Sequence, residues 1–96
     1  MRIAEIIHLE NHVLLVASED GAMGLFDIKP YLTGEVFAAL QDDDEFTAVH
    51  NGGSFIEWAC SADLSADTIE AHLIPAPPEI VQQFARRRHH AARSTG

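Results

Sequence analysis

The stretch HVLLVASEDGAMGLFDI, at residues 12–28, carries the signals that decide the fold. In it, two apolar runs flank Asp20 and Gly21. The pair Asp-Gly is typical of a two-residue hairpin turn, because both central positions of a type I′ turn need a positive φ. We therefore predict two antiparallel strands, His12–Ser18 and Met23–Ile28.

The register of this hairpin and the cover of its two faces follow from the same stretch. A two-residue loop places Val16 opposite Leu25 and Leu15 opposite Phe26. Residues Val13–Val16 are all apolar, and a strand that is apolar on both faces is usually covered on both. We expect a helix on one face, and either a second subunit or an ordinary exposed patch on the other.

The remaining segments predict a small α+β domain. Arg2–Leu9 is rich in isoleucine and predicts an N-terminal strand, while Thr47–His50 and Ser54–Trp58 predict a second hairpin. Ser65 is a suitable N-cap for a helix over Ala66–Leu73. The predicted fold is a small antiparallel sheet built from two hairpins and the N-terminal strand, with one packed helix and a basic C-terminal helix.

The segment between the hairpins contains apolar anchors and an acidic run. Val36, Phe37 and Leu40 are predicted to pack on a short helical turn. The acids of Asp42–Glu45 suit a helix N-terminus, where they meet the positive end of the helix dipole. They lack the spaced oxygens and the glycine of a calcium loop. Trp58, the single tryptophan, is predicted to lie in the core.

Four residues with three prolines, 75–78, mark the predicted domain boundary, because proline fits neither a helix interior nor a central strand. We predict an α+β domain at 1–74, a linker at 75–78, and a helix with a basic tail at 79–96. Pro78 suits the first helical position. We assign partner binding or docking to the apolar face of this helix, which consists of Ile80, Val81 and Phe84.

Charge is divided unevenly along the chain. The 96 residues carry 15 acids against 6 Lys and Arg, a net charge of -9. The acids dominate residues 1–78, whereas Arg86, Arg87 and Arg88 follow in the C-terminal helix. An acidic body repels phosphates and favours encounter with a basic protein. The basic tail is then a disordered terminus, a helix lying on the acidic body, or a nucleic-acid patch, in that order of preference.

Composition limits the cellular setting. Cys60 is the single cysteine, so an intrachain disulfide is excluded. The longest apolar run is too short to cross a bilayer, and Glu5 and His8 interrupt any signal-peptide core. We therefore expect a cytoplasmic protein that makes no membrane contact.

The motifs of the first domain, taken in order, are similar to those of a known family. They are Asp20-Gly21, Phe26-Asp27-Ile28-Lys29-Pro30-Tyr31-Leu32, Gly34-Glu35-Val36-Phe37, Ile56-Glu57-Trp58 and Ala62-Asp63-Leu64-Ser65-Ala66-Asp67-Thr68-Ile69. In this order and spacing the chain resembles, from about Ile3 to Glu70, the bacterial family of domain of unknown function 2442. The positions that we assign to the structural motif are Asp20, Gly21, Phe26, Asp27, Pro30, Gly34, Trp58, Asp63 and Leu64.

The resemblance implies a small α+β domain and no established catalytic activity. Some members resemble the N-terminal half of a helix-turn-helix DNA-binding protein. Others are encoded beside a second small protein and have been suggested to act as antitoxin-like partners. Residues 79–96 provide one helix and a tail, too little for a helix-turn-helix unit, so the chain resembles the short form. It departs from the family at Ser18, Ala59–Ser61 and Glu70.

Residues that could support catalysis or metal binding have simpler roles. An acid near Cys60 disfavours its thiolate, and His8 and His12, on a strand and a turn, do not converge as they would on a helix. No zinc or phosphate-loop spacing is present. Asp27 and Asp63 are expected to accept hydrogen bonds from turn or cap amides. We predict no catalytic residue, metal or cofactor.

The sequence therefore favours a non-enzymatic protein-interaction module that binds a basic protein, and the resemblance implies antitoxin-like or adaptor action on a partner encoded by a neighbouring gene. Two alternatives stay open. One is a DNA-linked transcriptional regulator that dimerises through this domain and touches nucleic acid through its arginine tail. The other is a small hydrolase that uses Asp27 and Asp63.

Overall fold

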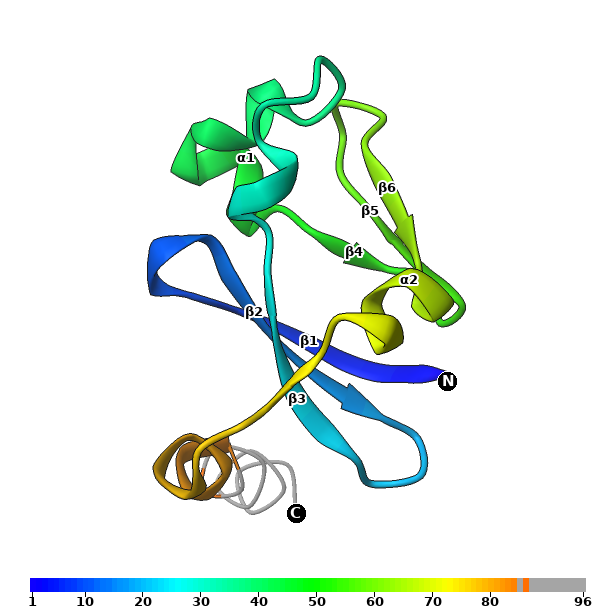
Figure 1. Ribbon diagram of the computed structural model, residues 1–96, viewed down its shortest axis with the longest axis vertical. Coiled ribbons are helices and arrows are strands. Elements are labelled where there is room, and N and C mark those ends of the chain that lie inside the picture. The colour runs from blue at the N-terminus through cyan, green and yellow to red at the C-terminus, as the bar shows by residue number, and fades with distance from the viewer. Residues whose placement is uncertain (85, 87–96) are drawn as a thin grey trace, which may run out of the picture.

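The two apolar runs around the Asp-Gly pair form the central hairpin of the molecule (Figure 1). The computed structural model describes residues 1–84 and 86. Its first sheet is antiparallel and has the strand order β1-β2-β3-β7. The strands are β1 (Ile3–Leu9), β2 (Val13–Ser18), β3 (Met23–Asp27) and β7 (Ile74–Pro75). The prolines thus begin on an edge strand, where a missing N–H is tolerated.

The loop of this hairpin is longer than predicted. The Ser18 N–H donates to the Ala22 carbonyl at 2.9 Å, which leaves the three residues Glu19–Gly21 as the loop. Gly21 adopts a φ of 95° and its N–H donates to the Ser18 carbonyl at 3.1 Å. This is the three-residue hairpin loop that ends on a left-handed glycine.

The predicted register is consequently wrong by one residue. Leu15 lies opposite Leu25, and Val16 lies opposite Gly24. Because side chains alternate between the faces of a strand, a shift of one residue also changes which residues of the two strands share a face of the sheet. Leu14 takes the position opposite Phe26 that was assigned to Leu15.

Hydrogen bonds from the loop lower the pKa of the Asp20 carboxyl below its ordinary value of 3.8; its partners are first the Ser18 hydroxyl and then the Ala22 amide, the latter at 3.0 Å. Because the pKa of this carboxyl is lower in the folded state than in the unfolded state, its ionised form stabilises the fold at pH values above the unfolded-state pKa. This stabilisation is lost as the pH falls through the folded-state pKa. We therefore expect Asp20→Asn to lose less melting temperature than the wild type between about pH 5 and pH 3. Parallel acid limbs in the two thermal denaturation series would contradict this.

The α+β class is confirmed, and the strands divide between two sheets. The second sheet has the order β4-β5-β6. Its strands are β4 (His50–Asn51), β5 (Phe55–Glu57) and β6 (Asp63–Ser65). The predicted second hairpin is present, with Gly53 at a φ of 89° in its turn. Two hydrogen bonds tie this turn to β1: the Ile3 N–H donates to the Gly53 carbonyl at 2.8 Å, and the Asn51 amide donates to the Ile3 carbonyl at 3.1 Å.

Two helices, α1 and α2, begin where the sequence predicted helix N-termini, at the acidic run 42–45 and at Ser65. Asp42 accepts from the Asp44 N–H at 2.9 Å and starts α1 (Asp43–Thr47). Ser65 accepts from the Thr68 N–H at 3.1 Å and starts α2 (Ala66–Ala71). The second helix ends two residues before the predicted end. Over the described residues, three 3-10 helices occupy Glu10–His12, Lys29–Tyr31 and Ala38–Gln41.

The main core lies between the two sheets and under these helices. Trp58 is buried as predicted, and its indole N–H donates to the Phe46 carbonyl at 2.9 Å. Leu40 is also buried, but Val36 is 54% exposed, so its predicted role as an anchor is wrong. The cause is the short helix, which begins at Ala38, beyond Val36. The fully buried core residues of this cluster include Leu14, Val16, Phe26, Ile28, Leu40, Phe46, Ile56, Ala62 and Ile69.

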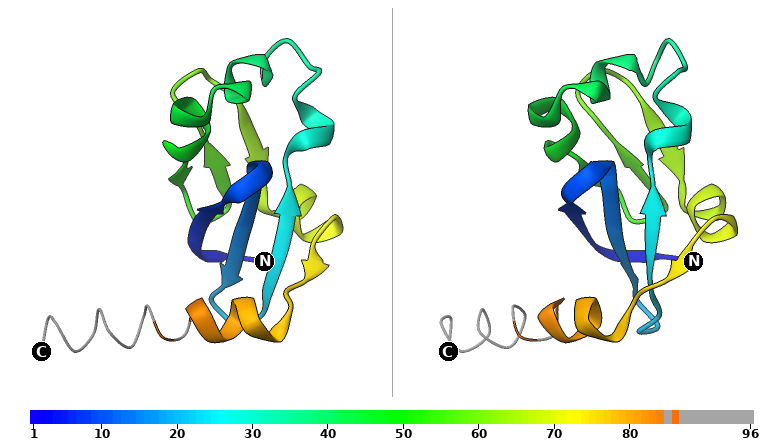
Figure 2. Two further views of the ribbon diagram at one scale, coloured as in Figure 1. Left: turned by 90° about the vertical axis from the view of Figure 1, so that its left-hand side faces the viewer. Right: turned by 60° about the vertical axis from the view of Figure 1, so that its left-hand side comes forward.

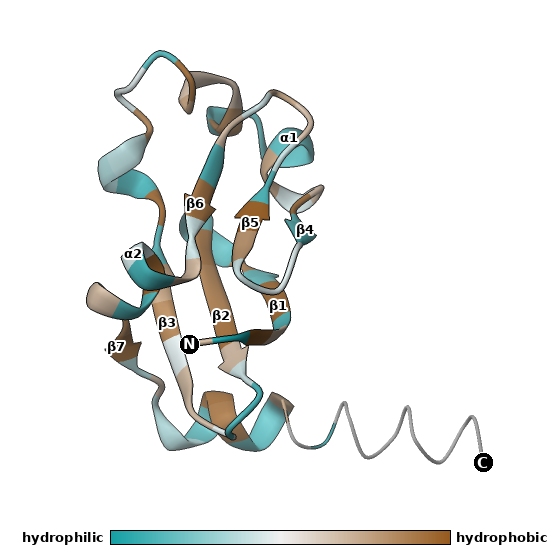
Figure 3. Ribbon diagram, turned by 90° about the vertical axis from the view of Figure 1, so that its right-hand side faces the viewer, coloured by the Kyte–Doolittle hydropathy of each residue, from teal (hydrophilic) through white to brown (hydrophobic). Residues whose placement is uncertain are grey.

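Residues 78–84 are helical and cross one end of the four-stranded sheet (Figure 2). β2 is apolar along most of its length (Figure 3), and its two faces contribute to different clusters. Leu14 and Val16 belong to the main core, whereas Leu15 and Ala17 form a second cluster. In the described part of the chain, no helix combines the length and apolarity needed to span a bilayer.

Candidate partner-binding surface

The second apolar cluster shows how the C-terminal helical segment is held. Phe84 is only 3% exposed and packs with Leu15 and Ala17, and Ile80 packs against the same cluster. Val81 is half-buried but does not belong to this cluster. The sequence left two options for this face of β2, a second subunit or an exposed patch. Part of the face is instead covered by the chain's own helix.

The basic residues lie beyond this packed turn. Arg86 is exposed. Arg87 and Arg88, which were also proposed to contact a partner, lie outside the described residues. The structure therefore presents the start of the basic segment at the surface, directly after the residue that anchors the helix.

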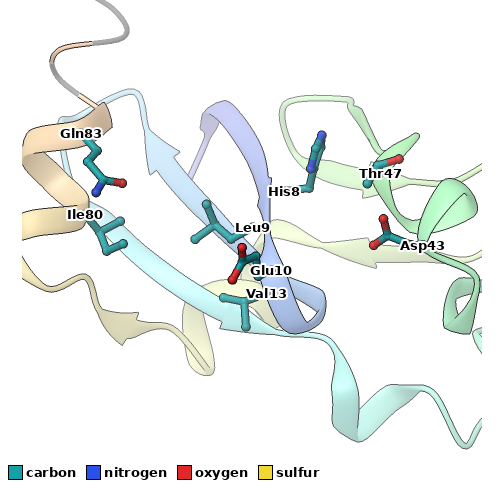
Figure 4. Close-up of a pocket in the computed structure, with 8 residues that line it drawn as sticks. All are labelled: His8, Leu9, Glu10, Val13, Asp43, Thr47, Ile80 and Gln83. Atoms are coloured by element: carbon teal, nitrogen blue, oxygen red, sulfur yellow. The ribbon is translucent and has the colours of Figure 1, made fainter.

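A groove of about 670 Å³ opens between residues 78–84 and α1 (Figure 4). It passes the junction of β1 and β2, so segments far apart in the sequence build it. In the close-up, Ile80 and Gln83 stand on one side and Thr47 and Asp43 on the other. The residues that line the groove are His8, Leu9, Glu10, Val13, Asp43, Thr47, Ile80 and Gln83.

The lining combines an apolar middle with acidic groups. Leu9, Val13 and Ile80 supply the apolar part, and Glu10 and Asp43 supply carboxylates that are exposed. Within residues 1–84 and 86, neither carboxylate takes part in an ion pair. A groove of this kind suits a partner that offers an apolar side chain next to a positive charge.

The cations of the acidic body are engaged elsewhere. The Arg2 guanidinium pairs with Glu19 at 3.1 Å, and the Lys29 ammonium pairs with Asp27 at 3.0 Å. The terminal amine of Met1 donates to the Glu70 carboxylate at 2.8 Å, and this bond raises the pKa of the amine. The carboxylates of the groove are thus left to attract charge from outside the domain.

The candidate catalytic residues are not brought together. Asp27 ends β3, and its carboxylate accepts from the Lys29 N–H at 2.9 Å, as expected for a turn acid. Asp63 begins β6 in the other sheet, opposite Glu57. Cys60 is half-buried, and its thiol faces the Val36 carbonyl at 3.8 Å. In the described residues no hydrogen bond or ion pair joins Asp27 to Asp63.

The histidines also have individual roles. His12 has a positive φ of 58°, and its Nε2 lies 2.8 Å from the Leu40 carbonyl, a contact that closes the core beside Phe46. His8 is exposed in the groove. Across residues 1–84 and 86, no three His, Cys, Asp or Glu side chains gather closely enough to hold a metal ion.

Most positions of the structural motif build the fold. Phe26, Trp58 and Leu64 are buried in the main core. Pro30 lies in a 3-10 helix, and the Gly34 N–H closes the next turn on the Tyr31 carbonyl at 3.0 Å. The groove residues, by contrast, are absent from that motif, because they come from three separate segments whose proximity no local pattern predicts.

Comparison with known proteins identifies the first three quarters of the chain. The family model described as Protein of unknown function (DUF2442) matches residues 3–75. The match covers both sheets and ends at the edge strand β7, so the helical segment that forms one wall of the groove lies beyond it. No curated protein and no solved structure matches the chain.

Proposed function

We propose that this chain, which belongs to the DUF2442 family, is a non-enzymatic protein-interaction module that binds a basic protein partner. The observation that carries the proposal is the groove beside residues 78–84, where an apolar middle meets exposed carboxylates without ion pairs inside the described part of the chain. Burial of an apolar side chain supplies affinity, and the carboxylates speed encounter and select a positive partner.

The mode of action that we propose is occlusion. The module covers a surface of its partner, in an antitoxin-like manner, and transforms no substrate. A partner encoded beside it and present in the same cytoplasm fits this role. The absence of a joined pair of candidate acids in the described residues supports a binding role over hydrolysis, because acid–base catalysis by two carboxylates needs both within reach of one substrate.

Co-purification of the full chain from its native host at two salt concentrations tests this function. We expect a basic protein that is retained at low salt and released at high salt, because exposed charge pairs are screened. The Glu10→Gln, Asp43→Asn variant should retain less of it. Nucleic acid in place of protein would favour the DNA-linked alternative, and turnover of a substrate by the purified chain would contradict the proposal.

A further inference from the structure

The backbone of β1 adds a second feature to the groove. β1 is the outermost strand of the four-stranded sheet, so one of its edges pairs with no strand of that sheet. His8 and Leu9, at the end of β1, line the groove. An unpaired strand edge is a template for another extended segment, and proteins usually cover or interrupt such an edge.

The register identifies which backbone groups face outward. In an antiparallel ladder, alternate residues direct their N–H and C=O groups to opposite sides. The Ser18 N–H donates to the Ala22 carbonyl, so the backbone N–H and C=O groups of Ser18 and of every second residue before it in β2 point toward β3. Leu15 belongs to the other set and faces β1, where it lies opposite Ile7. Ile7 therefore bonds to β2, and its two neighbours in β1 direct their backbone groups away from the sheet.

These neighbours are Ile6 and His8. Among the described residues, no hydrogen bond reaches their outward N–H or C=O groups. The same edge is occupied only at its start, where the outward groups of Ile3 bond to Gly53 and Asn51. The edge is thus bonded to the second hairpin at its start, whereas in the described residues the outward groups of Ile6 and His8 make no hydrogen bond, and His8 borders the groove.

We propose that this open edge of β1, at Ile6 and His8, binds an extended, basic segment of the protein partner as an additional antiparallel or parallel strand. The segment would place an apolar side chain against Leu9 and Ile80, and its arginine or lysine groups near Glu10 and Asp43. Main-chain hydrogen bonds then supply affinity and alternate side chains supply specificity, as in other cases of strand addition. This inference rests on the proposed function and specifies its binding mode.

Charge decides between this occupant and a second copy of the chain. A second copy would bring its own net charge of -9 to the edge. Its own β1 strand, added to this edge, would also carry a second Glu5. Like charges placed across a strand pair are destabilising, whereas a basic segment removes the repulsion and neutralises the acids of the groove. The edge therefore fits a partner of opposite charge.

Binding of a labelled peptide to the full chain, followed by fluorescence anisotropy at low salt, tests the binding mode. The probe is an eight-residue peptide that alternates valine with arginine. We expect saturable binding that falls about tenfold in His8→Pro, because the variant loses an outward N–H and its ring obstructs the incoming strand. The His8 N–H makes no bond to β2, so the proline leaves the β1–β2 ladder intact. His8→Ala removes the same groove-lining side chain but keeps the backbone N–H, so it measures the side-chain contribution and should lose clearly less binding than His8→Pro.

A change on the peptide side covers the case in which His8→Pro does not fold. N-methylation of alternate peptide amides removes the donors that face β1 and should abolish binding to the wild-type chain. Equal losses in His8→Ala and His8→Pro, unchanged binding of the methylated peptide, or no saturable binding of the parent peptide would each overturn strand addition. A dimer of the free chain that His8→Pro dissociates would overturn the choice of a basic occupant. Recovery of a basic partner that binds His8→Pro and the wild type equally would reject only this inference and leave the proposed function standing.

Discussion

Phe84→Ala is expected to lower the free energy of unfolding by about 2–4 kcal/mol, toward the lower part of the range for truncation of a buried phenylalanine. Phe84 is 3% exposed and packs on Leu15 and Ala17, which are themselves almost fully buried. The substitution removes the largest side chain of this cluster. For a domain of this size, such a loss lowers the melting temperature by roughly 10–30 °C.

The loss has an upper limit, because the helical segment can detach from the sheet. Once the undocked state of the helical segment is more stable than the docked state, the segment detaches from the sheet. Further truncation of its side chains then has no additional effect on stability. A chain that ends at Pro78 should therefore be destabilised to a similar extent as Phe84→Ala. Gln82→Ala, at an exposed position of the same helix, is the matched control and should change stability by less than about 0.5 kcal/mol. Urea denaturation of the four proteins provides the comparison, and an unchanged free energy of unfolding after truncation would contradict docking.

Docking of this segment also matters for function, because Ile80 contributes both to the second cluster and to the groove. A helix that has left the sheet removes one wall of the proposed site. It also exposes Leu15 and Ala17 to water, which lowers stability. Because the same detachment removes a wall of the groove, Phe84→Ala should weaken binding of the basic peptide as well. Stability and binding are thus coupled through the position of one short helix.

The features that could be predicted from the sequence are those set by neighbours in the chain. The N-cap Ser65 was predicted because a cap needs only a side chain that reaches an amide two or three residues ahead. The acidic run that contains Asp42 was predicted to begin a helix because its charges suit the positive end of the helix dipole. The position of the first hairpin was predicted from Asp20 and Gly21 in the same way. The apolar spacing of Ile80 and Phe84 predicted one face of a helix, since residues four apart share one face, but docking of this helix on the acidic body was ranked second to a disordered terminus.

The features that were missed depend on choices that local patterns leave open. The register of the first hairpin is set by the bond between Ser18 and Ala22, which selects a three-residue loop over the two-residue loop that Asp-Gly also permits. The division of the strands between two sheets depends on which strand β1 pairs with, and this pairing with β2 is not set by residues that are neighbours in the chain. The groove depends on all of these, because it forms only where Leu9, Asp43 and Gln83 meet.

Reversal of the two groove acids, Glu10→Lys with Asp43→Lys, is expected to weaken binding of the arginine–valine peptide by roughly 30- to 100-fold at low salt. Each exposed charge pair contributes up to about 1 kcal/mol, and reversal replaces each attraction with a repulsion of similar size. Together these changes amount to about 2–3 kcal/mol, and each 1.4 kcal/mol is a factor of ten in affinity. High salt should reduce the difference, since both effects are screened.

The matched control separates the position of the charges from the overall field of the acidic body. Glu35→Lys with Asp67→Lys changes the net charge by the same amount at two exposed acids that do not line the groove. This control should keep most of the affinity. Both double variants place a lysine in the first turn of a helix, at position 43 or 67, so the melting temperature of each is compared with that of the wild type to show what this costs in stability. A peptide that alternates valine with glutamate should bind the groove variant better than the wild type. Equal losses in the two double variants, with no recovery by the acidic peptide, would mean that the acidic body attracts basic peptides without a defined site, and the groove would then have no part in recognition.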